Sequence, residues 1–157
     1  TVTFVGDSNL YAVDARVILK PSGNAKAREL ILQGEYFRRD EDGQYSDTEK
    51  SASNVNFNDT SAGFYAQAVL KTSPSWRIGA RYSKLSPADV PSGLVGTALD
   101  GAGHDPVTYS VMTDWTSSEY GRLRLQYNRE EFATNDHDNQ IVLQYVVSLG
   151  AHGAHPF

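Results

Sequence analysis

Residues 122–128, with the sequence RLRLQYN, alternate strictly between polar and apolar side chains. Successive side chains of a β-strand point to opposite faces, so Leu123, Leu125 and Tyr127 would share one face. The polar residues between them would share the other. A period of two favours a strand over a helix. The segment therefore predicts a strand with one apolar and one polar face.

The same alternation returns along the chain, whereas helical periodicity is scarce. Its segments are 11–20, 29–39, 64–71, 76–83, 107–115, 123–128 and 140–149. Strands of roughly ten residues are long for a soluble sheet and suit a tilted membrane-spanning strand. We expect an all-β chain, with residues 1–157 forming a single domain and no plug domain.

Composition excludes several classes of protein. The chain has no cysteine, so disulfide scaffolds and thiol chemistry are excluded. Its net charge of -5 offers no basic footprint for nucleic acid. The sequence contains no apolar run of about 18 residues that would form a transmembrane helix.

The predicted connections alternate between short and long. Residues 21–27, 72–75 and 116–121 are short, whereas residues 38–62, 85–106 and 131–138 are longer and polar. Outer-membrane barrels have short periplasmic turns and longer extracellular loops. The alternation predicts an antiparallel transmembrane β-barrel with a meander topology.

Large aromatic residues gather at both ends of the predicted apolar face. Two such rows are typical of the girdles at the interfaces of a membrane barrel. The predicted girdle residues are Tyr36, Trp76, Tyr82, Tyr109, Trp115 and Tyr127.

A cation follows three of these tyrosines at a spacing of two residues, as Arg38, Lys84 and Arg129. Each cation shares a face with its tyrosine and would extend past the ring to the headgroup level. In a bacterial outer leaflet these cations would contact lipopolysaccharide phosphates. A solvated cation at a strand end is the simpler interpretation of any one of them.

The predicted polar face carries charges of both signs. In a membrane barrel this face lines the interior, where it would select solutes electrostatically without covalent chemistry. The predicted lumen residues are Arg16, Glu35, Arg77, Arg81, Asp114 and Arg124.

The chain ends on alternating apolar residues and a terminal aromatic residue. With Tyr145, Val147, Leu149 and Phe157, this ending resembles the signal that the barrel-assembly machinery reads in bacterial outer-membrane proteins. Further segments resemble a group of bacterial outer-membrane barrels described as zinc-regulated, TonB-dependent-receptor-like or porin-like. They are LQGEYFRR (32–39), DG (42–43), WRIGARY (76–82), RLRLQYNR (122–129) and SLGAHGAH (148–155), and the resemblance covers residues 11–157. It implies a location in the bacterial outer membrane and passage of a solute or metal ion.

The number of predicted strands bears on the size of the barrel. Bacterial single-chain barrels have an even number of strands, whereas the pattern here predicts seven. Residues 1–5, followed by a predicted turn at 6–9, are too short for an eighth spanning strand. We therefore favour the C-terminal part of a larger barrel, to be completed by further strands. The alternative is a complete eight-stranded barrel with a stunted first strand.

Neither a cofactor nor a metal site is predicted. A zinc site needs three or four converging ligands. His152 and His155 would point to opposite faces of a strand, and His137 lies in a predicted loop, so all three are weak candidates. Asp136 beside His137 is too little for a catalytic site, so we expect no enzyme.

The sequence thus predicts an outer-membrane barrel that passes or binds small polar solutes or metal ions through a charged lumen. One alternative is a structural or adhesive barrel with a closed interior and no transport. Another is a soluble lipocalin-like binder. That binder would bury the apolar face, which includes Leu30, Leu32, Ile78, Leu125 and Leu143.

Overall fold

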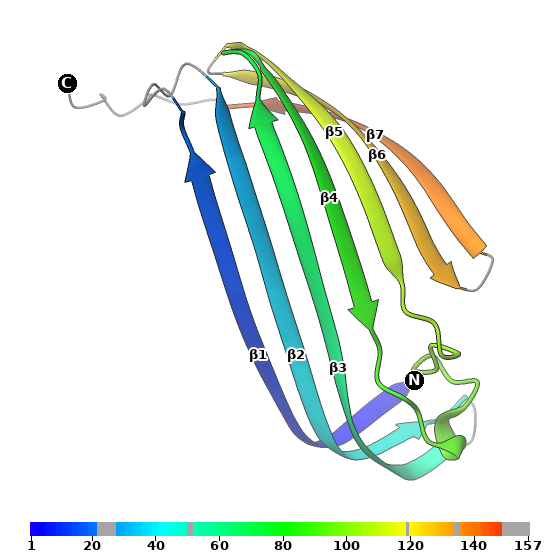
Figure 1. Ribbon diagram of the computed structural model, residues 1–157. Coiled ribbons are helices and arrows are strands. Elements are labelled where there is room, and N and C mark those ends of the chain that lie inside the picture. The colour runs from blue at the N-terminus through cyan, green and yellow to red at the C-terminus, as the bar shows by residue number, and fades with distance from the viewer. Residues whose placement is uncertain (22–27, 50–51, 119, 134–135, 149–157) are drawn as a thin grey trace.

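The computed structural model describes residues 1–21, 28–49, 52–118, 120–133 and 136–148. Within them the chain forms one seven-stranded sheet with the strands in sequence order, every neighbouring pair antiparallel (Figure 1). The strands are β1 (Val2–Leu19), β2 (Glu29–Asp47), β3 (Ala52–Lys71), β4 (Trp76–Ser86), β5 (Val107–Ser118), β6 (Gly121–Ala133) and β7 (Asp136–Val147). The predicted all-β antiparallel meander is confirmed. The sheet is not closed, because β1 and β7 do not pair with each other.

The first three strands are longer than the sequence predicts. They contain 18, 19 and 20 residues, whereas β4 to β7 contain 11 to 13. The turn predicted at residues 6–9 is wrong, since β1 runs unbroken from Val2 and pairs with β2 along its whole length. Residues 1–5 are therefore the start of this strand.

Two predicted long loops are also wrong. Residues 38–47 and 52–62 are paired strand, the outer parts of β2 and β3, and β7 begins at Asp136, close in sequence to the end of β6. Polar composition suggested loops there. Polar strands are stable when cross-strand side chains pair, as the Gln44 amide does by donating to Asn56 Oδ1 at 2.9 Å. The long connection between β4 and β5 is confirmed.

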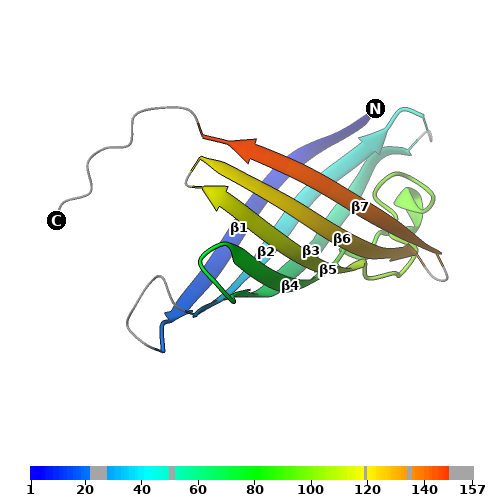
Figure 2. The ribbon, with the colours of Figure 1, turned by 90° about the horizontal axis from the view of Figure 1, so that it is seen from above.

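The sheet is curled, and the outer ends of β1, β2 and β3 bend toward the β4–β5 connection (Figures 1 and 2). Near these ends, Gly6 and Gly43 lie opposite each other. A Cβ on Gly43 would lie 2.5 Å from the Val5 carbonyl oxygen and 2.8 Å from Gly6 Cα. The close approach of the two strands there requires glycine.

The β4–β5 connection covers the concave side at this end, which we call the loop end. It contains the only helix among the described residues, the 3-10 turn η1 (Ser92–Leu94). Leu94 is fully buried and packs with Tyr45 and Phe57 in a small core, the only buried apolar cluster in the part described. The Tyr45 ring lies 5.2 Å from that of Phe57, edge to face. No helix among the described residues is both long and apolar enough to cross a membrane.

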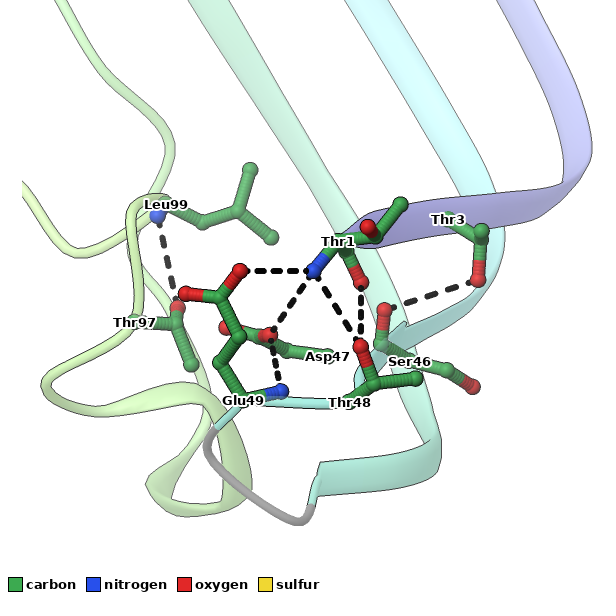
Figure 3. A network of polar contacts seen from close by, with 8 residues as sticks. All are labelled: Thr1, Thr3, Ser46, Asp47, Thr48, Glu49, Thr97 and Leu99. Atoms are coloured by element: carbon green, nitrogen blue, oxygen red, sulfur yellow. Dashed lines mark hydrogen bonds and ion pairs between the residues drawn. The ribbon is translucent and has the colours of Figure 1, made fainter.

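The start of β1, the end of β2 and the connection meet at the loop end (Figure 3). The Thr1 amino group donates to Thr48 Oγ1 and Glu49 Oε1, both at 3.1 Å. Nearby in the connection, the Leu99 amide donates to Thr97 Oγ1 at 3.3 Å. The contacts of Thr1 join the start of β1 to the end of β2, whereas the Thr97–Leu99 contact is local to the connection.

Candidate functional site: the concave polar face

In a soluble sheet that packs on a core, the apolar face is buried and the polar face is exposed. In this sheet the apolar face is the more exposed of the two. Along β6, Leu123, Leu125 and Tyr127 are exposed, whereas Arg122 and Arg124 are half-buried. Exposed aromatic and aliphatic side chains occur on every strand. On the edge strands β1 and β7, however, residues of both faces are exposed, so the difference between the faces is carried by the strands between them. The apolar residues share the convex face. The charged residues share the concave face, on which the connection lies (Figure 2).

All six predicted lumen residues belong to the concave face by strand register, but the structure brings only three of them together. Arg77 lies opposite Asp114, and Asp114 lies opposite Arg124. Arg81 lies elsewhere, with its guanidinium 3.8 Å above the Tyr65 ring in a cation–π contact. Arg16 and Glu35 lie on β1 and β2, away from the cluster.

Asp114 is the most deeply buried charged group among the described residues, with 1% of its surface exposed. Arg124 donates to it through two hydrogen bonds, from Nε to Oδ1 at 2.6 Å and from Nη2 to Oδ2 at 2.9 Å. This bidentate geometry is the strongest arrangement of an arginine and a carboxylate. Arg77 and Arg122 lie close enough to act on the same carboxylate electrostatically.

Charge along the concave face is segregated between its two ends. One cross-strand row contains four carboxylates and no cation, and its acidic members are Asp14, Glu35, Glu130 and Asp138. The next row toward the short connections contains two arginines and no acid, and its cations are Arg16 and Arg81. Cations also outnumber acids in the rows still closer to the short connections. We call the end of the sheet where the short connections lie the turn end.

A cavity of about 510 Å³ lies at the loop end, between the concave face and the β4–β5 connection. Phe37, Leu85 and Val90 contribute apolar walls, together with other small apolar side chains. Arg39 and Glu41 also line it and form an ion pair at 3.1 Å. The sequence does not predict this cavity, because the polar composition of residues 38–62 suggests a loop where β2 and β3 continue.

The predicted girdle residues lie on the convex face in two groups. Trp76 lies opposite Trp115 near the turn end, and both are exposed. Tyr82 packs against Tyr109, with ring centroids 5.3 Å apart, and against Phe64 at 5.8 Å. Tyr36 and Tyr127 are exposed on the same face.

The three predicted lipopolysaccharide-contacting cations each have a carboxylate partner. Ion pairs join Arg38 to Asp40 at 2.7 Å, Lys84 to Asp105 at 2.8 Å and Arg129 to Glu131 at 3.1 Å. The spacing of tyrosine and cation predicts the cation of each pair but not its carboxylate partner. These partners reduce the local positive charge that a phosphate group would meet.

The C-terminal residues are described only in part. Tyr145 and Val147 are exposed on β7, whereas Leu149, Phe157, His152 and His155 lie outside the described residues. His137 is part of β7, opposite Glu131, and so is not in a loop as predicted. No three His, Cys, Asp or Glu residues in the described part of the chain are grouped so as to hold a metal ion.

No protein-family model, curated protein or solved structure matches this chain. The resemblance to zinc-regulated or porin-like barrels therefore stays a prediction that rests on residue patterns.

Proposed function

We propose that this chain belongs to a bacterial outer-membrane β-barrel that passes or binds small polar solutes or metal ions through a lumen lined by the concave face. The inverted exposure of the two faces carries the proposal. Membrane barrels place apolar side chains outward toward lipid and polar ones inward. Contiguous exposed apolar surface of this extent is rare on soluble monomers and marks contact with a membrane or a partner.

The exposed leucines argue against a soluble lipocalin-like binder. Such a binder needs its apolar face inside the barrel. Leu32, Ile78, Leu125 and Leu143 are instead 40%, 48%, 49% and 70% exposed on the convex face. Apart from the cavity at the loop end, the concave side, where a lipocalin would hold its ligand, contains the arginines and carboxylates.

Strand direction supports a larger barrel. Because consecutive strands are antiparallel, β1 and β7 run in the same direction. They cannot pair antiparallel with each other, and unpaired strand edges are unfavourable in lipid. An odd number of additional strands between them gives an even total with every pair antiparallel, as in bacterial barrels. A second copy inserted with the same orientation would itself add seven described strands, but its β1 would pair parallel to β7.

The native tryptophans provide the direct test of the membrane proposal. The chain has two, Trp76 and Trp115, and both are exposed on the convex face. In vesicles containing brominated lipids, we expect strong quenching of their fluorescence, with little quenching by aqueous iodide. Efficient iodide quenching without lipid quenching would contradict the proposal.

A closed barrel without transport is the second candidate, and the β4–β5 connection favours it. The connection packs its Leu94 onto the concave face and so occupies interior space at the loop end. Conductance of the protein purified from its own membrane, measured in planar bilayers, distinguishes the two functions. Discrete ion-conducting steps support a channel, whereas a sealed bilayer with inserted protein supports the closed barrel.

The mass of that native polypeptide tests the larger barrel. A mass well above 17.2 kDa, or a stable complex with another β-rich chain, would supply the missing strands. A stable, membrane-inserted polypeptide of 17.2 kDa alone would contradict it. Lipopolysaccharide and the barrel-assembly machinery are the partners that the proposal implies.

A further inference from the structure

We propose that the turn end of the concave face holds a binding site for a small oxyanion, a phosphate or carboxylate group. The guanidinium groups of Arg77 and Arg122 are its cationic ligands. The hydroxyl groups of Thr116 and Ser118 are its neutral hydrogen-bond donors. The inference goes beyond a general charged lumen, because it assigns the ligand charge and the residues that bind it.

A cavity unites these side chains. It has a volume of about 330 Å³ and is lined by Arg77, Thr116, Ser118 and Arg122, with Ser148 at the end of β7. Strand register explains the grouping, since Thr116 lies opposite Arg122 and Arg77 lies opposite Asp114, two residues before Thr116. Three neighbouring strands thus bring two guanidinium groups and two hydroxyl groups to one place.

The charge balance at this cavity favours an anion. Among the described residues, Asp114 is the carboxylate that lies opposite Arg77 in the sheet, and Arg124 occupies both of its oxygens. The guanidinium groups of Arg77 and Arg122 make no hydrogen bond or ion pair with another residue in the described part of the chain. Both arginine residues are half-buried, and their N–H donors remain available for a ligand.

Arginine suits an oxyanion better than a neutral ligand at such a site. Its planar guanidinium donates two parallel hydrogen bonds to a carboxylate or phosphate. Arg77 on β4 and Arg122 on β6 lie on either side of β5 and line the same cavity, so they can bind separate oxygens of one anion from two sides. Partial burial strengthens these bonds, because the effective dielectric constant falls below that of water.

The site does not depend on the membrane proposal. If the chain forms a barrel, the cavity lies at the periplasmic mouth of its lumen. Binding can be measured in detergent micelles, whereas lipid exposure is measured with Trp76 and Trp115 in vesicles. One proposal can therefore fail while the other stands.

The test is titration of the full-length polypeptide in detergent micelles with inorganic phosphate, followed by calorimetry and by NMR of the arginine Nε–H groups. We expect one saturable site with shifts at Arg77 and Arg122. Arg77→Gln and Arg122→Gln should each weaken binding by about tenfold or more, because each removes charge-assisted hydrogen bonds. Acetate should compete with phosphate, since both present oxyanions.

Arg16→Gln is the matched control. It removes the same charge from the same face, but Arg16 lies outside the cavity. We expect its phosphate affinity to stay within about twofold of the unsubstituted protein, as two distant surface charges interact weakly in water. An equal loss in Arg16→Gln, or binding that never saturates, would show a general electrostatic effect and overturn the site.

Conservative variants keep the test valid if a glutamine variant does not fold. Arg122→Lys retains the charge but not the bidentate donors, so we expect an intermediate loss of affinity. Thr116→Val removes one hydroxyl and should weaken binding by a few fold. Unchanged affinity in both variants, with native strand content by circular dichroism, would also overturn the proposal.

Discussion

The convex and concave faces of the same strands differ in the side chains that they expose. On the neighbouring interior strands β6 and β5, Leu125 of the convex face is 49% exposed, whereas Asp114 of the concave face is 1% exposed. In water, exposure of apolar side chains forgoes about 25 cal/mol for each Å² left unburied. Lipid around the convex face removes that cost, since its hydrocarbon solvates those side chains. The difference between the faces thus favours an apolar medium outside and a polar one inside.

The loop end of the concave face differs from the rest of the sheet. There alone, in the described part of the chain, Tyr45, Phe57 and Leu94 form a buried apolar core. Elsewhere the concave face is organised by charge, with the Asp114–Arg124 pair at the turn end. The loop end is thus stabilised by burial of apolar side chains, whereas the turn end is stabilised by a buried ion pair.

Leu125→Arg should give the largest effect, because it places a charge on the convex face of a central strand. We expect a loss of about 2–4 kcal/mol in the free energy of folding into lipid if Leu125 faces the bilayer midplane. Gln126→Arg is the matched control, one residue along on the concave face, and should cost much less. Urea titration in lipid vesicles measures both. Equal losses would remove the distinction between the faces.

Asp114→Asn should give the next largest effect by leaving Arg124 without its carboxylate. The lost bidentate pair should lower the free energy of unfolding by about 2–3 kcal/mol, since Asp114 is buried and Arg124 partly exposed. Glu130→Gln removes a half-buried carboxylate of the same face that has no ion-pair partner among the described residues. It should change stability by under about 0.5 kcal/mol. Comparable losses would show that burial of Asp114 does not matter.

Leu94→Ala tests the separate character of the loop end. Removing a fully buried leucine costs about 2–3 kcal/mol where the surroundings relax in part. We expect only the β4–β5 connection to be destabilised, which would be seen as faster amide hydrogen exchange at Thr97 and Leu99. Val95→Ala, at an exposed neighbouring residue, should leave exchange unchanged. Faster exchange throughout β5 and β6 would contradict a local core.

Side-chain alternation was enough to predict the strands and their faces, because a period of two is a local property. It located β4 to β7 within a few residues and assigned Arg77, Asp114 and Arg124 to one face. Arg122 has the same parity as Arg124, so the same pattern could have included it. Polar strands gave no comparable signal. Beyond Arg38, the β2–β3 hairpin depends on pairing between polar side chains of the two strands. Because polar residues are also typical of loops, the sequence predicts a loop there.

Contacts that depend on register or on the path of the β4–β5 connection could not be predicted from one sequence. The pairing of Lys84 with Asp105 joins a strand end to a residue 21 positions later. The core around Leu94 requires the connection to fold back over β2 and β3. Sequence spacing predicts neither, because many paths of a connection of this length are compatible with the same strands.

Lys84→Gln should give the smallest effect, a change in the pKa of one carboxyl group. Lys84 lies at the edge of the convex face, where it pairs with Asp105 of the connection. The hydrogen bond from Lys84 lowers the pKa of the Asp105 carboxyl from its usual 3.8. A depressed folded-state pKa means that this contact stabilises the fold above pH 3.8 and is lost as pH falls through the lower value. In Lys84→Gln we expect the pKa of Asp105 to rise toward 3.8, followed by NMR of its carboxyl carbon. Asp100 is the internal control, since the amides of Gly96 and Ala102 lower its pKa instead. A parallel rise at Asp100 would mean that the variant disturbs the whole connection, and an unchanged pKa at Asp105 would mean that its cation partner lies elsewhere.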